Sequence, residues 1–238
     1  MKKTVSFLSI LAFSSSLFAA SDAQIVEYFK SQIPVPNIKI EVTSRSSIEQ
    51  IKDMDYVSLN ISDGSRSQKM SVFTQGDLIF PDVISINDGG SIKEKLDKAK
   101  FMQELAKVYK NEDAKNILIV GNDANKPTLI EFTDPECPFC NKELQAIEEK
   151  LKNYNLKLIF TPVHDRSSLE KSVLIYKQTN AIEDTAEKIK ILRKYYNGDV
   201  DAKVSDEEVD ALEKLRQKYF TAGLKGVPLY VPEADLLK

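Results

Sequence analysis

Two cysteines separated by two residues are the part of this sequence best suited to chemistry. Cys137 and Cys140 are the only cysteines among the 238 residues, and they lie in the run Phe-Thr-Asp-Pro-Glu-Cys-Pro-Phe-Cys. An apolar, β-prone run at 128–133 precedes them, and apolar residues at helical spacing follow them. The sequence therefore predicts a strand, a short loop and a helix that begins at the cysteines.

The start of that helix gives the two thiols different tasks. Asp134 and Pro135 break the strand, so we expect Cys137 to be the N-cap residue, with Pro138 at the first helical position. Unpaired backbone N–H groups and the helix dipole favour an ionised sulfur there, so the pKa of Cys137 should fall below the free value of about 8.5. Cys140, one turn further on and more buried, is expected to resolve a mixed disulfide formed by Cys137.

Three other interpretations of the cysteine pair are weaker. A zinc site needs four ligands, and the chain has two cysteines and a single histidine, His164, so no metal is expected. A purely structural disulfide across two residues would gain little chain entropy. Inert buried thiols are rarely placed at a turn between a strand and a helix.

The first 20 residues have the pattern of a signal peptide. Lys2 and Lys3 are followed by an apolar and serine-rich run over 5–18, too short for a permanent membrane anchor, and by two alanines suited to cleavage. We therefore expect a protein exported to the bacterial periplasm. The full chain has a net charge of −3, and the signal removes only basic residues, so the composition gives no indication of nucleic-acid binding.

The exported chain divides into three further parts. Residues 21–90 alternate a short helix with β-prone runs and turn signals, which predicts a small α+β domain without a chemical cluster, interpreted as a dimerisation or packing module. Residues 91–113 have an apolar stripe at helical spacing behind the capping pair Ser91 and Glu94. This helix is either a rigid linker or packs on the next domain. Residues 114–238 predict an α/β domain with a helical insertion at about 165–223.

Two single ionisable residues have more than one interpretation. Glu131 lies between apolar residues of the expected strand, six residues before Cys137, so it is either a buried acid that moves protons to and from Cys140 or a carboxylate facing solvent. His164 follows the next expected strand, and a loop residue is a better interpretation than a catalyst.

A glycine, a valine and a proline open the last apolar run. Pro228 cannot donate to a strand ladder. If the Val227–Pro228 bond is cis, the turn is tight and the backbone of Val227 is left available to a polypeptide substrate.

These residues resemble the thioredoxin superfamily, and within it the periplasmic disulfide isomerases of the DsbC/DsbG type. The resemblance implies that Cys137 is the nucleophile, Cys140 the resolving thiol and Glu131 a buried catalytic acid. It also implies that Pro138, Phe139, Val227 and Pro228 contact the substrate. The expected fold is an N-terminal dimerisation domain, a linker helix and a thioredoxin-like domain.

The resemblance implies a homodimeric thiol:disulfide isomerase or reductase without cofactor. Its substrates would be exported proteins with non-native disulfides, and a membrane thiol reductase of the DsbD type would keep its cysteines reduced. Val227 and Glu131 are instead more typical of DsbA, which leaves a thiol oxidase as the alternative, and a chaperone-like binding module is a third. Because only ten residues follow Pro228, we expect either a trimmed fold with an exposed sheet edge or a truncated sequence.

Overall fold

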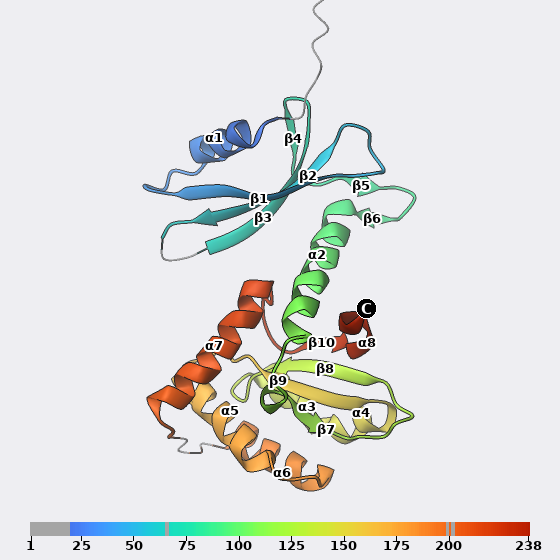
Figure 1. Ribbon diagram of the computed structural model, residues 1–238, viewed down its shortest axis with the longest axis vertical. Coiled ribbons are helices and arrows are strands. Elements are labelled where there is room, and N and C mark those ends of the chain that lie inside the picture. Colours follow the sequence, from blue (N-terminus) through green and yellow to red (C-terminus); the bar gives the residue numbers. More distant parts are fainter. Residues whose placement is uncertain (1–19, 65–66, 199, 201–202) are drawn as a thin grey trace, which may run out of the picture. The chain divides into compact units, whose positions relative to one another are not determined.

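The computed structural model describes residues 20–64, 67–198, 200 and 203–238. The chain forms two compact units, residues 1–97 and residues 98–238, and the division falls inside helix α2 (Ile92–Tyr109) (Figure 1). The predicted signal peptide lies outside the described residues except for Ala20. Within the described ranges, no helix has both the length and the apolar character needed to cross a bilayer.

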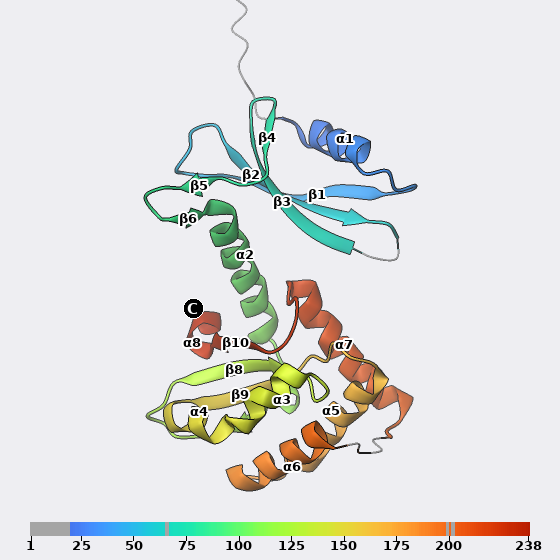
Figure 2. The same cartoon turned by 180° about the vertical axis from the view of Figure 1, so that it is seen from behind.

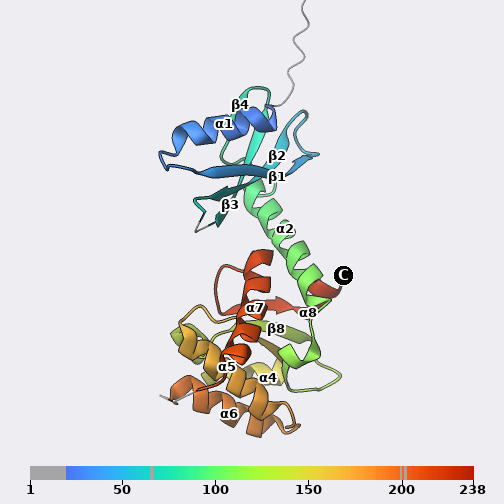
Figure 3. The ribbon, with the colours of Figure 1, turned by 60° about the vertical axis from the view of Figure 1, so that its left-hand side comes forward.

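The first unit is built on a four-stranded antiparallel sheet in which each strand pairs with the next along the chain. Its strands are β1 (Lys39–Ser47), β2 (Asp55–Ser62), β3 (Ser67–Gln75) and β4 (Leu78–Phe80), and a separate pair is formed by β5 (Ile84–Ser85) and β6 (Gly90–Ser91). Helix α1 (Asp22–Gln32) lies along β1 (Figure 3). The predicted α+β content is therefore confirmed, and dimerisation stays a prediction.

Helix α1 follows from its sequence. The Ser21 side chain accepts a hydrogen bond from the Gln24 amide, and the Gln24 side-chain oxygen accepts one from the Ser21 amide, which satisfies two otherwise unpaired donors at the helix start. Ile25 is fully buried in an apolar cluster with Val57 and Leu59 of the sheet. Burial of this stripe, rather than helix propensity alone, stabilises so short a helix.

The second unit contains a four-stranded mixed sheet in the order β10-β8-β9-β7. Its strands are β7 (Leu118–Val120), β8 (Thr128–Thr133), β9 (Asn155–Phe160) and β10 (Leu229–Pro232). Strands β8 and β9 are parallel, whereas β7 and β10 are antiparallel to their neighbours. The strand predicted at 128–133 is confirmed without a shift.

Helices cover the sheet of the second unit. They are α3 (Pro138–Gln145), α4 (Ile147–Asn153), α5 (Arg166–Thr179), α6 (Thr185–Asn197), α7 (Asp206–Ala222) and α8 (Glu233–Leu237). Figure 2 shows α3 and α4 running in front of β8 and β9. Tyr219 of α7 packs on Phe132 of β8, with ring centroids 4.9 Å apart. The predicted helical insertion between β9 and β10 is therefore present.

The residues that follow Pro228 cover more of the core than the sequence indicated. After β10 the chain forms the short helix α8, in which Leu236 is fully buried while Leu237 is 56% exposed. The Glu233 carboxylate binds Lys157 of β9, with the charged atoms 2.5 Å apart, and also accepts a hydrogen bond from the Tyr109 hydroxyl. These polar contacts fix α8 against the sheet.

Candidate active site

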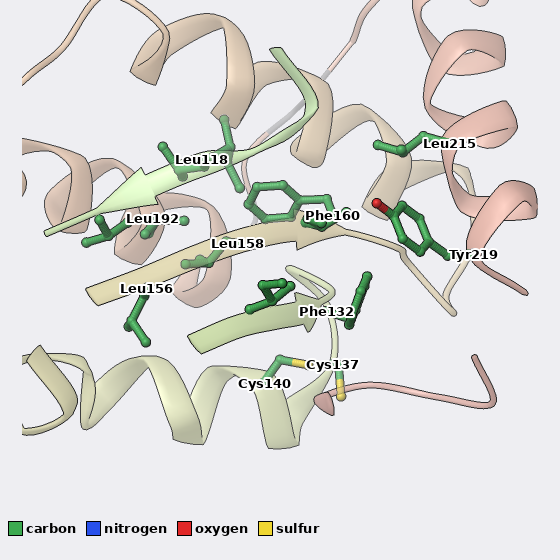
Figure 4. Close-up of a cluster of buried hydrophobic side chains, with 14 of the residues drawn as sticks. Leu118, Phe132, Cys137, Cys140, Leu156, Leu158, Phe160, Leu192, Leu215 and Tyr219 are labelled. Carbon is green, nitrogen blue, oxygen red and sulfur yellow. The ribbon is translucent and has the colours of Figure 1, made fainter. Parts of the chain in front are cut away.

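The cysteine pair lies where β8 ends and α3 begins. Cys137 is the N-cap residue, in an extended backbone conformation, and Pro138 opens the helix as predicted. Both thiols are free, and Cys140 is fully buried while Cys137 keeps 4% of its surface. Figure 4 shows the two cysteines beside Phe132 at the border of the apolar core. The predicted difference in burial is therefore present.

The loop before β10 closes over the first thiol. The Val227–Pro228 peptide bond is cis, as the sequence suggested. The Cys137 Sγ atom lies 3.8 Å from the Val227 carbonyl oxygen, a distance that suits a weak S–H donor. The antiparallel pairing of Leu229 with Phe132 holds this loop at the end of β8. The Val227 carbonyl therefore already has the reduced thiol as a partner.

The predicted substrate contacts surround this thiol. Phe139 is 71% exposed at the start of α3, next to the exposed Pro138. Val227 and Pro228 are half-buried, and the Val227 carbonyl contacts the Cys137 sulfur. A nearly buried sulfur beside an exposed aromatic ring can meet a disulfide presented by an apolar polypeptide segment.

Glu131 is buried in the sheet with 5% of its surface exposed, so the solvent-facing interpretation is wrong. Burial raises the pKa of Glu131 to about 7. The positive charge of Lys150 and hydrogen bonds with Tyr230 and Thr133 offset part of that increase. Tyr230 faces Glu131 across the β8–β10 ladder. A carboxyl with this pKa can both accept and release a proton near neutral pH.

Tyr230 connects the buried carboxyl with two charged residues of the covering helices. Its hydroxyl accepts a hydrogen bond from Lys150 Nζ and lies 3.3 Å from a carboxylate oxygen of Glu143. Lys150 and Glu143 also form an ion pair of 2.6 Å, and the Lys150 ammonium lies 4.3 Å from the centroid of the Tyr230 ring. The side chains of Lys150 and Glu143 are 20% and 37% exposed, so this end of the cluster meets solvent.

Thr133 lies at the other end of this cluster. Burial raises the pKa of the Cys140 thiol far above its ordinary value, and a hydrogen bond with the Thr133 hydroxyl opposes the increase. The Thr133 oxygen is 2.8 Å from the Tyr196 hydroxyl of α6. Cys140 would thus need a nearby proton acceptor in order to react as a thiolate.

Asp134, which the sequence predicted only as the residue that ends the strand, is a further functional candidate. Its side chain is fully buried and accepts hydrogen bonds from the Glu136 amide at 2.8 Å, the Val163 amide at 2.8 Å and the Ser168 hydroxyl. Burial alone would raise the pKa of Asp134, yet these donors and His164 hold it below the ordinary value. The available signal was an acidic residue directly after an apolar strand.

His164 is the loop residue that the sequence predicted, and it binds this carboxylate. The His164 Nδ1 atom lies 2.6 Å from an oxygen of Asp134, and the His164 amide donates to the same oxygen at 3.2 Å. The side chain is 41% exposed. The ring therefore ties the loop after β9 to the loop that carries Cys137. Among the described residues, no group of three or more His, Cys, Asp or Glu side chains is arranged to hold a metal ion.

Comparison with solved structures identifies the architecture. Helicobacter pylori DsbG superimposes with a TM-score of 0.51 and 21% sequence identity, over 88% of this chain and 99% of that one. The chain has the fold of this DsbG. The predicted thioredoxin-like fold of the second unit is thereby confirmed, while the dimerisation role predicted for the first unit stays a prediction.

Two shorter matches concern other disulfide-exchange proteins. The catalytic domain of Proteus mirabilis ScsC is 22% identical over 56% of this chain and 86% of its own, with a TM-score of 0.37. The thiol-disulfide exchange protein α-DsbA2 of Wolbachia pipientis is 17% identical over 58% of this chain and 86% of its own, with a TM-score of 0.39. No protein-family model matches the chain, and no curated protein matches it significantly.

Proposed function

We propose that this chain is a thiol:disulfide oxidoreductase of the periplasm that acts as a disulfide isomerase or reductase on misoxidised exported proteins. The observation that carries the proposal is the position of Cys137, at a helix N-terminus, against the Val227 carbonyl of a cis-proline loop and beside the exposed ring of Phe139. A thiol so placed meets the unpaired backbone N–H groups of the helix start and lies where a polypeptide can reach it.

The proposed reaction is based on the different environments of Cys137 and Cys140. The Cys137 thiolate attacks one sulfur of a substrate disulfide, a new S–S bond forms, and the second substrate sulfur leaves as a thiolate. A substrate thiol then displaces Cys137, which completes isomerisation, or Cys140 displaces the substrate, which completes reduction. In the second case the buried Cys140 must first lose its proton, and Glu131 is the proposed acceptor.

The partners of this reaction belong to the same proposal. The likeness to DsbG extends through the N-terminal unit, which supports a homodimer held by residues 21–90. Thiol–disulfide exchange needs no metal or organic cofactor. A reductase or isomerase must instead be kept reduced, so a membrane thiol reductase of the DsbD type is the proposed electron donor.

The test is the unscrambling of misoxidised ribonuclease in a glutathione buffer, with the native mass of the purified protein measured in parallel. The wild type should accelerate recovery of ribonuclease activity well beyond the buffer alone. Cys137→Ser should abolish the acceleration, and Cys140→Ser should accumulate mixed disulfides with the substrate. A wild type that does not exceed the buffer, or a Cys137→Ser variant that keeps full activity, would contradict the proposal.

A thiol oxidase is the second candidate, because Val227 precedes the cis-proline and a buried glutamate lies on β8. The equilibrium of the Cys137–Cys140 pair with glutathione separates the two functions. A strongly oxidising, monomeric protein that oxidises reduced ribonuclease without reshuffling it would favour the oxidase. A dimer that reshuffles disulfides while partly reduced would favour the isomerase.

A further inference from the structure

A largely buried ion pair lies directly before the nucleophile. Glu136 precedes Cys137 in the sequence, and its Oε1 atom lies 2.9 Å from the Nζ atom of Lys171 on α5. The Lys171 side chain is 11% exposed and the Glu136 side chain 22%. Lysine is one of the residue types least often buried. A buried lysine whose partner is the neighbour of the reactive cysteine therefore calls for an explanation.

The start of α5 fixes the Glu136 carboxylate on both of its oxygens. The Ser167 hydroxyl donates a hydrogen bond of 2.9 Å to Oε2, while Lys171 binds Oε1. Ser167 and Lys171 are four residues apart, so they lie on the same face of the helix. Ser168 donates to Asp134 in the same loop. The first turns of α5 thus hold both acids of the segment that leads into Cys137.

A gain in stability does not account well for this pair. Replacing a buried ion pair by apolar side chains of similar volume is often neutral or stabilising. The charge of Glu136 has a more direct consequence for Cys137. A carboxylate without a counter-ion would oppose negative charge on the neighbouring sulfur, and water screens charges weakly in such an enclosed place. It would thereby offset the start of α3, whose unpaired N–H groups favour an ionised sulfur.

We propose that Lys171 neutralises the Glu136 carboxylate and thereby allows Cys137 to react as a thiolate. Lys171 and Ser167 act through Glu136, so they are positioning residues. This role rests on the proposed function, in which the Cys137 thiolate attacks the substrate disulfide.

Other titratable groups surround the same loop. They are Asp134 in the loop itself, His164 after β9, Cys140 on α3 and the exposed Lys225 in the cis-proline loop. All four stay unchanged in the variants below, so a difference between variants reports on Glu136 and Lys171.

The test measures the rate at which iodoacetamide alkylates Cys137 in the reduced full protein from pH 3 to pH 9, with the labelled peptide identified by mass spectrometry. Only the thiolate reacts, so the midpoint of the rate against pH reports the ionisation of the sulfur. Lys171→Met leaves the Glu136 charge uncompensated and should raise the midpoint by about 0.5 pH unit, a roughly threefold slower reaction below the midpoint. Glu136→Gln leaves the Lys171 charge uncompensated and should lower the midpoint by a similar amount.

The double variant Glu136→Gln/Lys171→Met removes both charges and should return the midpoint to the wild-type value. Opposite shifts that cancel are the signature of charge. A loop merely loosened by loss of the contact would shift both single variants in the same direction. Lys171→Arg keeps the charge and should keep the wild-type midpoint. If Lys171→Met does not fold, Glu136→Gln and the double variant still decide the result.

Lys177→Met is the matched control. It makes the same change further along α5, at a lysine that pairs with Glu208 instead, and should be alkylated like the wild type. Single variants that both match the wild type, or that shift in the same direction, would overturn the proposed charge balance. A shift in Lys177→Met as large as that in Lys171→Met would do so as well.

Alkylation needs no disulfide substrate, so this result is independent of isomerase activity. Opposite shifts in the variants of a protein that does not unscramble ribonuclease would support the charge balance and reject the proposed function. A protein that unscrambles ribonuclease, and whose variants show no shift, would keep the proposed function and reject the charge balance.

Discussion

The pKa values of two buried carboxyls three residues apart, Glu131 and Asp134, are shifted in opposite directions. Both are almost entirely removed from water, and burial by itself raises the pKa of each. The pKa of Glu131 nevertheless rises to about 7, whereas the pKa of Asp134 falls below its ordinary value. The difference lies in their hydrogen-bond donors, since Asp134 receives backbone amides, a hydroxyl and an imidazole, and Glu131 mainly hydroxyls.

The comparison shows how one strand and the residue after it can carry a stable anion and a titratable carboxyl three residues apart. Backbone N–H groups favour the ionised form of a carboxyl because they cannot accept a proton. A hydroxyl serves the ionised and the protonated form equally well, because it donates to one and accepts from the other. Asp134 is therefore built to stay charged and hold two loops together, while Glu131 is built to change its charge.

The largest loss of stability is expected from replacing Asp134, the buried anion that holds two loops together. Asp134→Asn puts an amide, with half the acceptor capacity and no charge, in front of the amide, hydroxyl and imidazole donors that bind the carboxylate in the wild type. We expect the free energy of unfolding to fall by about 4 kcal/mol, as for loss of one partner of a buried charged network. Urea unfolding at pH 7 measures this value.

The matched control for this variant is Asp165→Asn, which makes the same change at an exposed residue whose side chain makes no capping hydrogen bond. It should leave the unfolding midpoint almost unchanged. An Asp134→Asn protein as stable as this control would mean that the donors around Asp134 find other acceptors.

The second prediction concerns how the free energy of unfolding depends on pH because Glu131 titrates. The folded carboxyl binds its proton more tightly than the unfolded one, so the wild type loses stability as pH rises from about 4.5 to about 7. Glu131→Gln removes this loss. The free energy of unfolding of the variant minus that of the wild type should therefore be about 3 kcal/mol larger at pH 8 than at pH 4. Unfolding curves at several pH values measure it.

The control here is Glu149→Gln on α4, where the side chain is 70% exposed. Its stability difference from the wild type should stay the same across the pH range. If the Glu131→Gln difference is equally flat, Glu131 does not titrate near neutral pH and cannot serve as the proton acceptor of Cys140.

The smallest loss of stability is expected from replacing His164, the half-exposed residue that binds the Asp134 carboxylate. His164→Ala removes one donor to Asp134 and leaves the amides and Ser168 in place, so the free energy of unfolding should fall by about 1 kcal/mol. The pKa of Asp134 should move up toward its ordinary value. Because a lowered pKa contributes stability that is lost as pH falls through it, acid unfolding should begin at a higher pH than in the wild type.

The sequence was sufficient for features set by neighbours along the chain. The strand at 128–133, the N-cap at Cys137 and the hydrogen bond from the Glu94 amide to the Ser91 hydroxyl at the start of α2 follow from local residue order, and all are present. The Val227–Pro228 cis bond was suggested by a local oddity, a proline at the start of an apolar run. In each case the responsible residues are adjacent or three positions apart.

The rest of the site depends on partners far apart in sequence. Tyr230 lies opposite Glu131 because β10 adds to the sheet beside β8, and Tyr196 reaches Thr133 only after two inserted helices. The hydrophobic periodicity of the sequence does not predict contacts between residues so far apart along the chain. Asp134 carried a usable signal, a charge directly after an apolar strand. Apart from the Glu136 amide, however, its donors come from the distant residues Val163, His164 and Ser168.

The contact between Cys137 and Val227 has a consequence for how this protein can vary. The thiol meets a main-chain oxygen, not a side-chain atom. Replacing the residue at position 227 would leave that oxygen in place while changing the surface beside the reactive sulfur. A library built at position 227 can therefore vary the surface beside the reactive sulfur while the sulfur keeps its backbone neighbour.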